Sequence, residues 1–399
     1  MIKKSMVVAW CMLLLQQMSF AKEKIEGLRE DTTAEKAVFV SGREGYQSYR
    51  IPAIIKLKNG DLLAFCEGRV AHAGDFGDID IVMKRSADNG KTWNTLQKVV
   101  DYGDLQAGNP APVVDLTDPA YPQGRIFLFY NTGNNHEGEV RRGKGVREVW
   151  YVTSTDHGQT WSEPVNITLQ THRPNQPAFN PAYRFKEDWR SYANTPGHAV
   201  QLEAGKFKGR IFIAANHSAG MPQDAFKDYR AHGYYTDDHG KTFKLGESVS
   251  FEGGNESMAA ELTGGRLLMN TRNQQGQVRN RIVSISKDGG ATWDTTFYDK
   301  QLPDPVNQGS VLSFLDKRNR ILAFCNAAAT QNRDSLTLRL SKDDGQHWFY
   351  NKRVATAPLA YKGGYAAYSD LVRLGKRTVG ILYEKDNYKS IVFIPVKWK

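Results

Sequence analysis

The sequence repeats one octapeptide, S-x-D-x-G-x-T-W, as SADNGKTW (Ser86–Trp93), STDHGQTW (Ser154–Trp161) and SKDGGATW (Ser286–Trp293). Two variants are TDDHGKTF (Thr236–Phe243) and SKDDGQHW (Ser341–Trp348). The pattern has the chemistry of a hairpin turn: the Asp side chain caps backbone N–H groups, the Gly takes a positive φ, and the aromatic ring packs beneath. Five copies in one chain predict a fold built from repeated β-hairpins.

A second repeat, a turn followed by an apolar run, lies upstream of each octapeptide and occurs once more near the C-terminus. The six copies are Asn59–Phe65, Gly124–Phe129, Gly209–Ile213, Gly265–Met269, Asn319–Phe324 and Gly375–Leu382. Each follows another short apolar run, so each unit is predicted as four antiparallel strands with the octapeptide between the third and the fourth. With helical periodicity nearly absent, we predict an all-β fold, a six-bladed β-propeller of four-stranded antiparallel blades, whose sixth blade lacks the octapeptide.

The alternation of turns in a four-stranded meander predicts which face of the propeller carries function. The octapeptide turns share one face with the turns between strands 1 and 2. The opposite face receives the loops that enter strand 1 and those that follow strand 2. Polar residues gather on this second face: Arg50, Glu256 and Tyr368 just before a first strand, and Arg69, Asp75, Arg272, Arg333 and Glu384 just after a second strand. We therefore expect the functional site on this second face. We expect the octapeptides, which lie on the opposite face, to have a structural role.

Composition and the N-terminus narrow the class of protein. The 399 residues are 40% hydrophobic with a net charge of +10, which is typical of a globular protein and suits an anionic glycan or a membrane surface. No nucleic-acid-binding signature occurs, and the absence of HExxH and CxxC argues against a structural zinc site. Residues 1–21 read as a signal peptide cleaved near Ala21, which leaves residues 22–399 as a single propeller domain in a secreted or periplasmic protein.

The cysteines are predicted to be free. After removal of the leader only Cys66 and Cys325 remain, and they end equivalent strands in the first and fifth repeats. Equivalent positions two blades apart lie beyond the Cα separation of roughly 7 Å that a disulfide tolerates. We expect two buried thiols that act as small apolar residues.

Several of these motifs resemble those of sialidases. The octapeptides look like the Asp-boxes of that family, Tyr49-Arg50-Ile51-Pro52 resembles its F/Y-R-I-P motif, and Ala367–Leu371 resembles the segment that carries its tyrosine nucleophile. The resemblance extends over essentially the whole of residues 22–399. It implies an enzyme without a metal ion or an organic cofactor.

The resemblance also implies roles for individual residues. Arg50, Arg272 and Arg333 match the three arginines that bind the sugar carboxylate, and Arg69 resembles an additional arginine of the pocket. Tyr368 would be the nucleophile with Glu256 as its base, Asp75 would be the acid/base catalyst, and Glu384 would orient the first arginine. A neutral phenol is a suitable nucleophile for the sugar carbon that bears the carboxylate, because a carboxylate nucleophile would be repelled by that charge. The alternatives are Tyr365 for the nucleophile, Glu261 for the base, Asp78 or Asp80 for the acid, and Arg320 or Arg339 for the third arginine.

The function implied is that of a retaining exo-α-sialidase that releases terminal sialic acid from glycoconjugates through a tyrosine-linked intermediate. One alternative is an intramolecular trans-sialidase, which would keep the same residues and pass the sugar to its own hydroxyl. A second is a non-catalytic sialoglycan-binding propeller, and a third is an Asp-box propeller that acts on other polysaccharides. The expected partners are sialylated glycans, with no nucleic acid and no obligatory protein partner.

Overall fold

The structure, a computed structural model, describes residues 35–398. The predicted leader at residues 1–21 and its cleavage near Ala21 lie outside this range. Among the described residues, no helix has both the length and the apolar character that a membrane span requires. Contacts within the chain define one compact unit from Lys36 onward.

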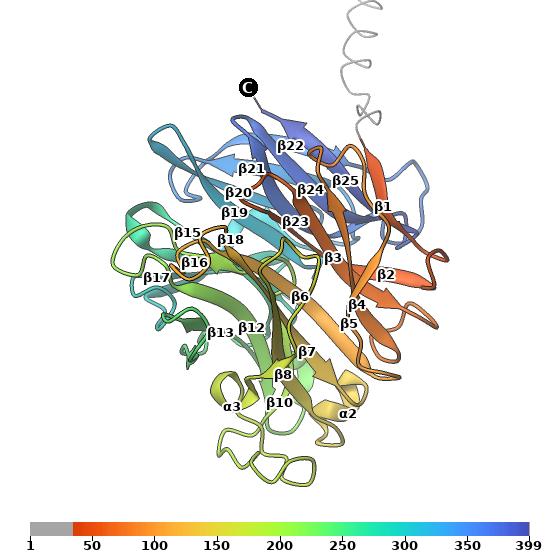
Figure 1. The fold of residues 1–399 in the computed structure, drawn as a ribbon, viewed down its shortest axis with the longest axis vertical. Helices are drawn as coiled ribbons and strands as arrows, with labels where there is room; N and C mark the ends of the chain where they lie inside the picture. Colours follow the sequence, from red (N-terminus) through yellow and green to blue (C-terminus); the bar gives the residue numbers. More distant parts are fainter. Residues whose placement is uncertain (1–34, 399) are drawn as a thin grey trace, which may run out of the picture. The chain divides into compact units, whose positions relative to one another are not determined.

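Antiparallel sheets in a propeller arrangement make up this unit (Figure 1). The prediction of an all-β propeller is confirmed in the coarser form of a mostly-β propeller, because short helices also occur. The first sheet has eight strands: β2 (Ser48–Lys56), β3 (Leu62–Arg69), β4 (Ile79–Ser86), β5 (Gln97–Val100), β6 (Gln106–Asp115), β7 (Arg125–Gly133), β8 (Arg147–Ser154) and β9 (Val165–Asn166). It consists of two four-stranded halves joined between β4 and β6 by a single parallel pair, Ile79 with Gln106.

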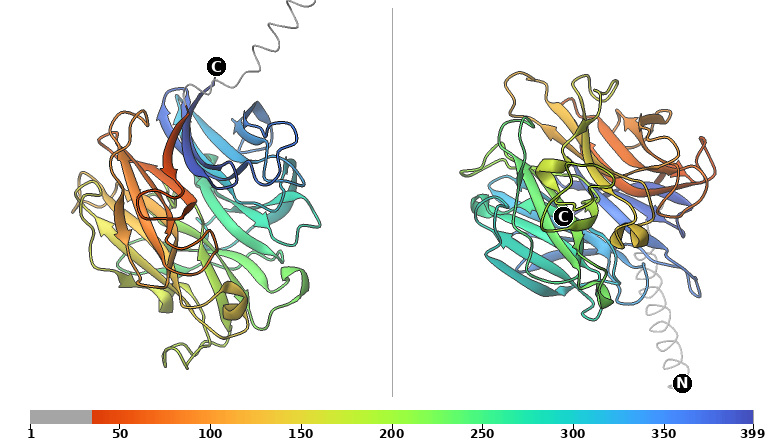
Figure 2. Two further views of the ribbon diagram at one scale, coloured as in Figure 1. Left: turned by 90° about the vertical axis from the view of Figure 1, so that its right-hand side faces the viewer. Right: turned by 90° about the horizontal axis from the view of Figure 1, so that it is seen from below.

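The next three sheets follow in chain order. One contains β10 (Trp189–Asn194), β11 (Val200–Gln201), β12 (Ile211–Ala219), β13 (Tyr229–Thr236) and β14 (Lys244–Leu245). The second contains β15 (Gly254–Glu261), β16 (Leu267–Asn273), β17 (Asn280–Ser286) and β18 (Thr295–Pro303). The third contains β19 (Gly309–Asp316), β20 (Asn319–Ala327), β21 (Leu336–Ser341) and β22 (Trp348–Ala355). Figure 2 shows from two further sides that consecutive sheets lie next to one another.

The last sheet closes the ring with a strand from the other end of the described chain. It contains β23 (Ala366–Gly375), β24 (Thr378–Lys385) and β25 (Ser390–Lys397), and its fourth strand is β1 (Lys36–Val40). β1 pairs with β25 from Lys36–Phe393 to Val40–Ser390, so red and blue ribbons lie side by side in Figure 1. The repeats predict the three C-terminal strands, but they give no sign of β1, which lies before the first repeat.

Short helices interrupt the loops between strands. They are α2 (Glu137–Arg141), α3 (Thr168–Thr171), and the 3₁₀ turns η2 (Asp224–Phe226) and η3 (Thr263–Gly265). The core lies between neighbouring sheets, where apolar side chains of adjacent strands interdigitate, as Phe65 and Met83 do with Leu128 across the two halves of the first sheet. Cys66 and Cys325 are free and buried in such layers, as predicted.

Each octapeptide joins a third strand to a fourth strand, as the repeat predicts. In the first copy Asp88 Oδ1 accepts a hydrogen bond from the Thr92 N–H (2.9 Å), and Gly90 has φ +87°. The serine adds a second cap that the sequence analysis missed, because Ser86 Oγ accepts from the Gly90 N–H (2.8 Å). Gly90 is needed for space as well as for φ, since a Cβ there would lie 2.1 Å from the ring of Phe393.

The octapeptide aromatics pack sideways onto the preceding sheet, or onto the preceding half of the first sheet, rather than only beneath their own turn. The ring centroids of Trp93 and Phe393 lie 5.6 Å apart, and those of Trp161 and Phe65 lie 6.0 Å apart. Trp348 is different, because its ring contact is with Phe324 of its own sheet. The octapeptides thus join neighbouring sheets, and the junction before Trp348 is filled differently from the others.

Candidate active site

A cavity of about 250 Å³ lies on the face that the alternation of turns predicts. Its lining comes from six separate stretches of the chain and includes all four arginines of the sequence analysis, together with Asp75, Glu256 and Tyr368. No octapeptide residue lines it. Only a closed ring of sheets brings together residues as distant in sequence as Arg50 and Tyr368.

Tyr368 and Glu256 form the centre of the cavity with Arg272. The Tyr368 hydroxyl donates to Glu256 Oε1 (2.5 Å), while Arg272 Nη1 donates to Glu256 Oε2 (2.7 Å) and to the Tyr368 oxygen (2.8 Å). Burial raises the pKa of Tyr368 and the Glu256 carboxylate raises it further, against the opposing charges of three arginines. The phenol is therefore neutral, and the carboxylate that could take its proton is already its hydrogen-bond partner.

The other two arginines lie close to the Tyr368 ring. The guanidinium carbons of Arg50 and Arg333 are 5.3 and 5.4 Å from its centroid. Tyr388 contacts both arginines. Its ring centroid lies 3.9 Å from the guanidinium carbon of Arg50, and its hydroxyl accepts from Arg333 Nη1 (2.8 Å). Three guanidinium groups around one phenol offer the N–H donors that bind a carboxylate.

Local irregularities in the first strands direct three of these side chains into the cavity. The strand register shifts between Arg50 and Ala53, between Gly254 and Ser257, and between Ala366 and Ser369. Such bulges re-aim side chains at the ends of sheets. Arg50, Glu256 and Tyr368 each lie at or inside one of these shifts, which the repeat pattern cannot reveal.

Glu384 supports this arrangement from below and is only 1% exposed. Its Oε1 accepts from Arg50 Nε (2.7 Å) and from the Ile51 N–H (2.9 Å), and its Oε2 accepts from the Tyr368 N–H (3.3 Å). Ile51 has φ +63°, which is strained for a β-branched residue. The carboxylate therefore holds a strained backbone and orients Arg50, which lies next to it.

Asp75 enters the cavity from the loop after β3. Its Oδ1 accepts from Arg69 Nη1 (2.7 Å) and lies 3.9 Å from Arg50 Nη1, while the side chain is 82% exposed. Partial burial raises the pKa of Asp75, but the charges of Arg69 and Arg50 outweigh it and hold that pKa below 3.8. In the ligand-free protein Asp75 is thus an ionised carboxylate.

The alternative residues lie elsewhere. Asp78 and Asp80 line a separate hollow, where Asp80 Oδ2 accepts from the Tyr46 hydroxyl (2.6 Å). Glu261 accepts from two backbone N–H groups and pairs with Arg320. Neither Glu261, the alternative base, nor Arg320, an alternative third arginine, lines the cavity. Tyr365 and Arg339 also do not line the cavity.

Sequence reasoning missed several residues of the cavity. Glu67, two residues before Arg69 on the same strand, accepts from that arginine at 2.7 Å and could have been inferred from this spacing. Arg147, Glu137 and Gln106 line the far wall. Gln106 and Arg147 belong to strands of the second half of the first sheet, and Glu137 belongs to α2, between β7 and β8. No sequence motif pointed to function in this part of the chain.

Three buried histidines lie behind another wall of the cavity. His217 Nδ1 lies 3.0 Å from His232 Nδ1, Trp189 stacks on His217 with centroids 3.5 Å apart, and His172 packs against Tyr192, which lines the cavity. Burial lowers the pKa of all three histidines, that of His232 to about 3. They are therefore neutral at physiological pH.

Among residues 35–398, Asp115, Asp118 and His239 are the one group whose ligand atoms lie close enough together to hold a metal ion. Asp115 Oδ1 already accepts from the Thr117 N–H (2.9 Å) and from Gln201 Nε2 (2.7 Å), and His239 Nδ1 contacts its other oxygen (2.8 Å). Hydrogen bonds within the protein thus account for this cluster, which lies outside the candidate site.

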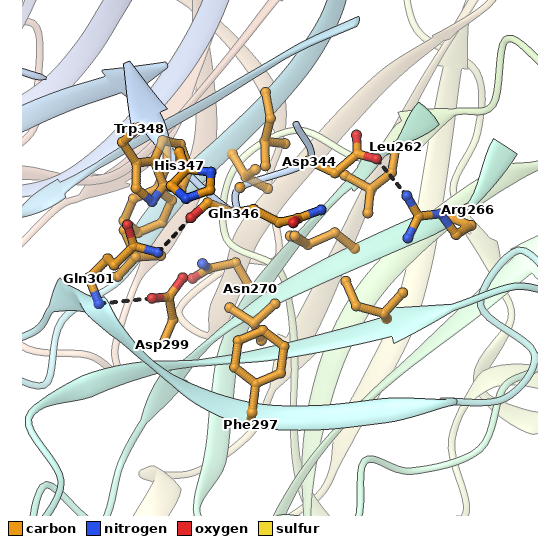
Figure 3. Close-up of a pocket in the computed structure, with 18 residues that line it drawn as sticks. Leu262, Arg266, Asn270, Phe297, Asp299, Gln301, Asp344, Gln346, His347 and Trp348 are labelled. Carbon is orange, nitrogen blue, oxygen red and sulfur yellow. Dashed lines mark hydrogen bonds and ion pairs between the residues drawn. The ribbon is translucent and has the colours of Figure 1, made fainter. Parts of the chain in front are cut away.

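A larger cavity of about 490 Å³ lies between β16 and β20, beside the fifth octapeptide (Figure 3). Its interior is mainly apolar, and the charged groups at its mouth are paired, as Arg266 is with Asp344. The cavity exists because β16 presents Leu268 and Asn270 at its wall. At the equivalent positions of the repeat, β7 carries the larger Phe127 and Phe129, which pack on the octapeptide Thr236–Phe243. A packing difference explains this cavity, and it lacks the converging charges of the first.

Comparisons with known proteins identify the family to which the chain belongs. Residues 60–381 match the BNR repeat-like domain family. The chain is 33% identical over 373 residues to a sialidase of Micromonospora viridifaciens, which covers 89% of this chain and 52% of that protein. It is 29% identical over 372 residues to an exo-alpha-sialidase of Arthroderma benhamiae, which covers 87% of this chain and 80% of that protein. The chain thus spans about half the length of the Micromonospora sialidase.

Solved structures show the same fold. A Hadza microbial sialidase, Hz136, superposes with a TM-score of 0.75 at 24% identity, covering 91% of this chain and 68% of that one. A leech intramolecular trans-sialidase superposes with a TM-score of 0.69 at 17% identity, covering 92% and 70%. Because the family match takes in most of the sequence, the chain belongs to the sialidase family that carries the BNR repeat-like domain.

Proposed function

We propose that the chain is a retaining exo-α-sialidase, a glycoside hydrolase that releases terminal sialic acid from glycoconjugates through a covalent intermediate on Tyr368. The observation that carries the proposal is the hydrogen-bonded group of Tyr368, Glu256 and Arg272, with two further arginines beside the same ring. A neutral phenol held against a carboxylate base, in a pocket made for an anion, suits attack on the anomeric carbon of a sugar acid.

The scaffold in this proposal is a six-bladed propeller. Dividing the eight-stranded sheet at the Ile79–Gln106 pair gives two four-stranded blades, and the four remaining sheets bring the number to six. The domain spans residues 22–399 of a protein that is secreted or periplasmic after cleavage near Ala21.

The contacts support the following first half-reaction. Arg50, Arg272 and Arg333 bind the sugar carboxylate, so the anomeric carbon beside it faces the Tyr368 oxygen. That oxygen forms a bond to the anomeric carbon while its proton passes to Glu256 along the 2.5 Å hydrogen bond. The bond to the glycosidic oxygen breaks, and Asp75 gives this oxygen a proton.

The second half-reaction reverses these proton transfers. Asp75, now a carboxylate, takes a proton from a water molecule that attacks the anomeric carbon, and Glu256 returns a proton to the Tyr368 oxygen as it leaves. Two displacements at one carbon retain its configuration. Asp75 must be protonated in the first step, so bound substrate has to weaken its ion pair with Arg69.

The test is the release of free sialic acid from a fluorogenic aryl sialoside, with the product identified by mass spectrometry and the configuration of the sugar first released read by proton NMR. The proposal predicts release of the α-configured free sugar by the wild-type protein and none by the Tyr368→Phe variant. An anhydro sugar as sole product would instead identify an intramolecular trans-sialidase. Binding of sialosides without turnover would identify a sugar-binding protein, and either result would contradict the proposal.

A further inference from the structure

Gln308 immediately precedes β19 and is only 1% exposed. Its side-chain amide bonds to the backbone of Ser369 in both directions. Gln308 Oε1 accepts from the Ser369 N–H (2.9 Å), and Gln308 Nε2 donates to the Ser369 carbonyl oxygen (3.0 Å). Such a pair of hydrogen bonds is what a residue of a neighbouring strand would provide. One side chain therefore fixes the backbone of the residue that follows Tyr368.

The backbone of Ser369 needs a partner of this kind because of its place in the sheet. β23 is an edge strand, with β24 as its neighbour. Ser369 is fully buried, so its N–H and carbonyl groups must be paired within the protein. Ser369 also ends the register shift that begins at Ala366 and contains Tyr368. The bulge re-aims the Tyr368 side chain, and the Gln308 amide fixes the backbone at the end of that bulge.

The same amide is connected to the backbone beside Glu256. Gln308 Nε2 also donates to the Pro196 carbonyl oxygen (3.3 Å). The residue before this proline, Thr195, accepts through its own carbonyl oxygen from the Ser257 N–H (2.9 Å). A continuous path of hydrogen bonds and peptide bonds thus joins the candidate base to the candidate nucleophile, through Ser257, Thr195, Pro196, Gln308 and Ser369.

The base and the nucleophile come from different sheets, so their separation depends on contacts of this kind. Glu256 lies in β15 and Tyr368 in β23, and the sheet of β19–β22 comes between them along the chain. The two side chains are joined by a hydrogen bond of 2.5 Å, along which the proposed mechanism moves a proton. A misplacement of about 1 Å would lengthen this contact beyond hydrogen-bond reach and can cost about 10²-fold in rate.

We propose that Gln308 is a positioning residue: by holding the backbone beside the nucleophile, it keeps the Tyr368 oxygen within hydrogen-bond reach of Glu256. Gln308 does not line the cavity, so it acts through Tyr368 and not on the substrate. The inference rests on the proposed function, because it concerns the proton transfer of that mechanism. Loss of the amide slows the attack of the tyrosine, while the arginines still bind the sugar carboxylate.

The first test variant is Gln308→Met, which keeps the length of the side chain and loses both hydrogen bonds to Ser369. For an aryl sialoside, kcat/KM should fall about 10- to 100-fold at every pH. The dissociation constant of free sialic acid, measured by calorimetry, should change less than about 3-fold, because the interaction is needed for the reaction and not for binding.

The second variant, Gln308→Glu, tests the two hydrogen bonds by pH. A protonated carboxyl group has the shape of the amide, accepts from the Ser369 N–H and donates to the Ser369 carbonyl oxygen, whereas a carboxylate can only accept. Burial among the uncharged partners of Gln308 raises the pKa of this carboxyl group above its ordinary value of about 4.3. The ratio of kcat/KM to the wild-type value should therefore approach 1 at pH 5 and fall toward that of Gln308→Met at pH 8.

Gln201 supplies the matched control, because its amide also joins two backbone segments. Its Oε1 accepts from the Leu116 N–H (2.8 Å), and its Nε2 donates to the Gly209 carbonyl oxygen (3.1 Å). Gln201 does not line the cavity of the candidate active site. Gln201→Met should lower the melting temperature and leave kcat/KM unchanged, which separates a general loss of packing from a loss of positioning.

Wild-type kcat/KM in Gln308→Met would overturn the inference. So would a ratio for Gln308→Glu that stays constant between pH 5 and pH 8, because the hydrogen bonds to Ser369 would then not matter. A loss of sialic acid affinity as large as the loss of kcat/KM would also overturn it, since the amide would then support the whole pocket. If the wild-type protein cleaves no sialoside, it is the proposed function that fails.

Discussion

Asp75→Asn tests the least settled step of the proposed mechanism, the protonation of the leaving group. Asn keeps the size of the side chain and an oxygen that can accept from Arg69, so the loop should stay in place. The charges of Arg69 and Arg50 hold the pKa of Asp75 below its ordinary value, so its carboxyl group is ionised in nearly all free molecules at pH 6. The proton must therefore be acquired with substrate bound, and Asn can never supply it.

The size of the loss should depend on the leaving group. General acid catalysis contributes about 10²- to 10⁴-fold, so Asp75→Asn should lower kcat/KM, which reports the first half-reaction, by that factor on sialyllactose, whose leaving sugar hydroxyl is a weak acid. On an aryl sialoside, whose phenolate leaves without protonation, the loss of kcat/KM should stay within about 10-fold. The assay is steady-state kinetics on both substrates, with Asp78→Asn as the matched control from the same loop.

Equal losses on the two substrates would refute the assignment of Asp75 as the acid. A selective loss in Asp78→Asn would transfer the role to Asp78, although that residue lines a different hollow. Rescue of the aryl reaction by added azide, with a sialyl azide as product, would support a role for Asp75 in the second step as well.

Three further predictions concern the nucleophile, the packing and the histidines. Tyr368→Phe should abolish turnover with an unchanged melting temperature, and a 3-fluoro sialosyl fluoride should label Tyr368 in the wild-type protein; mass spectrometry that finds the label elsewhere would contradict this. Leu268→Phe should fill part of the 490 Å³ cavity and raise the free energy of unfolding by about 0.5–2 kcal/mol without altering kinetics; a lower melting temperature would mean that the junction cannot accept a ring. The pKa of His232 lies below its ordinary value of 6.5, so below pH 6.5 the unfolded chain binds a proton that the folded chain does not. The free energy of unfolding therefore decreases as the pH is lowered. His232→Phe should reduce this slope between pH 6.5 and 4.5 by up to about 1.4 kcal/mol per pH unit, and calorimetry that shows the same slope in both proteins would exclude the effect.

The sequence predicts the features that repeat and misses those that occur once. The octapeptides carry their turn chemistry locally, so their place between third and fourth strands, and the face that bears Arg50 and Tyr368, follow from spacing alone. The position of Asp75 relative to Arg69 depends on a loop with no repeat, and sequence alone left three carboxylates open. Arg147 was missed because it lies in the second half of the first sheet, where no sequence motif pointed to function. Bulges at Arg50 and Tyr368 likewise depend on pairing between strands that are far apart in sequence.

The closure of the ring by β1 has a consequence for how the protein is made. β1 leaves the ribosome before every other described strand, and its partner β25 is completed last, so the contact between them waits for nearly the whole of synthesis. Contacts between such distant segments form slowly. Arg50 and Glu384 lie on either side of the same junction, in β2 and β24, and their ion pair forms only when the first and last sheets meet. A nascent chain that ends before β24 lacks Glu384 and therefore cannot assemble the pocket around Arg50. We expect a fragment truncated at that point to be inactive.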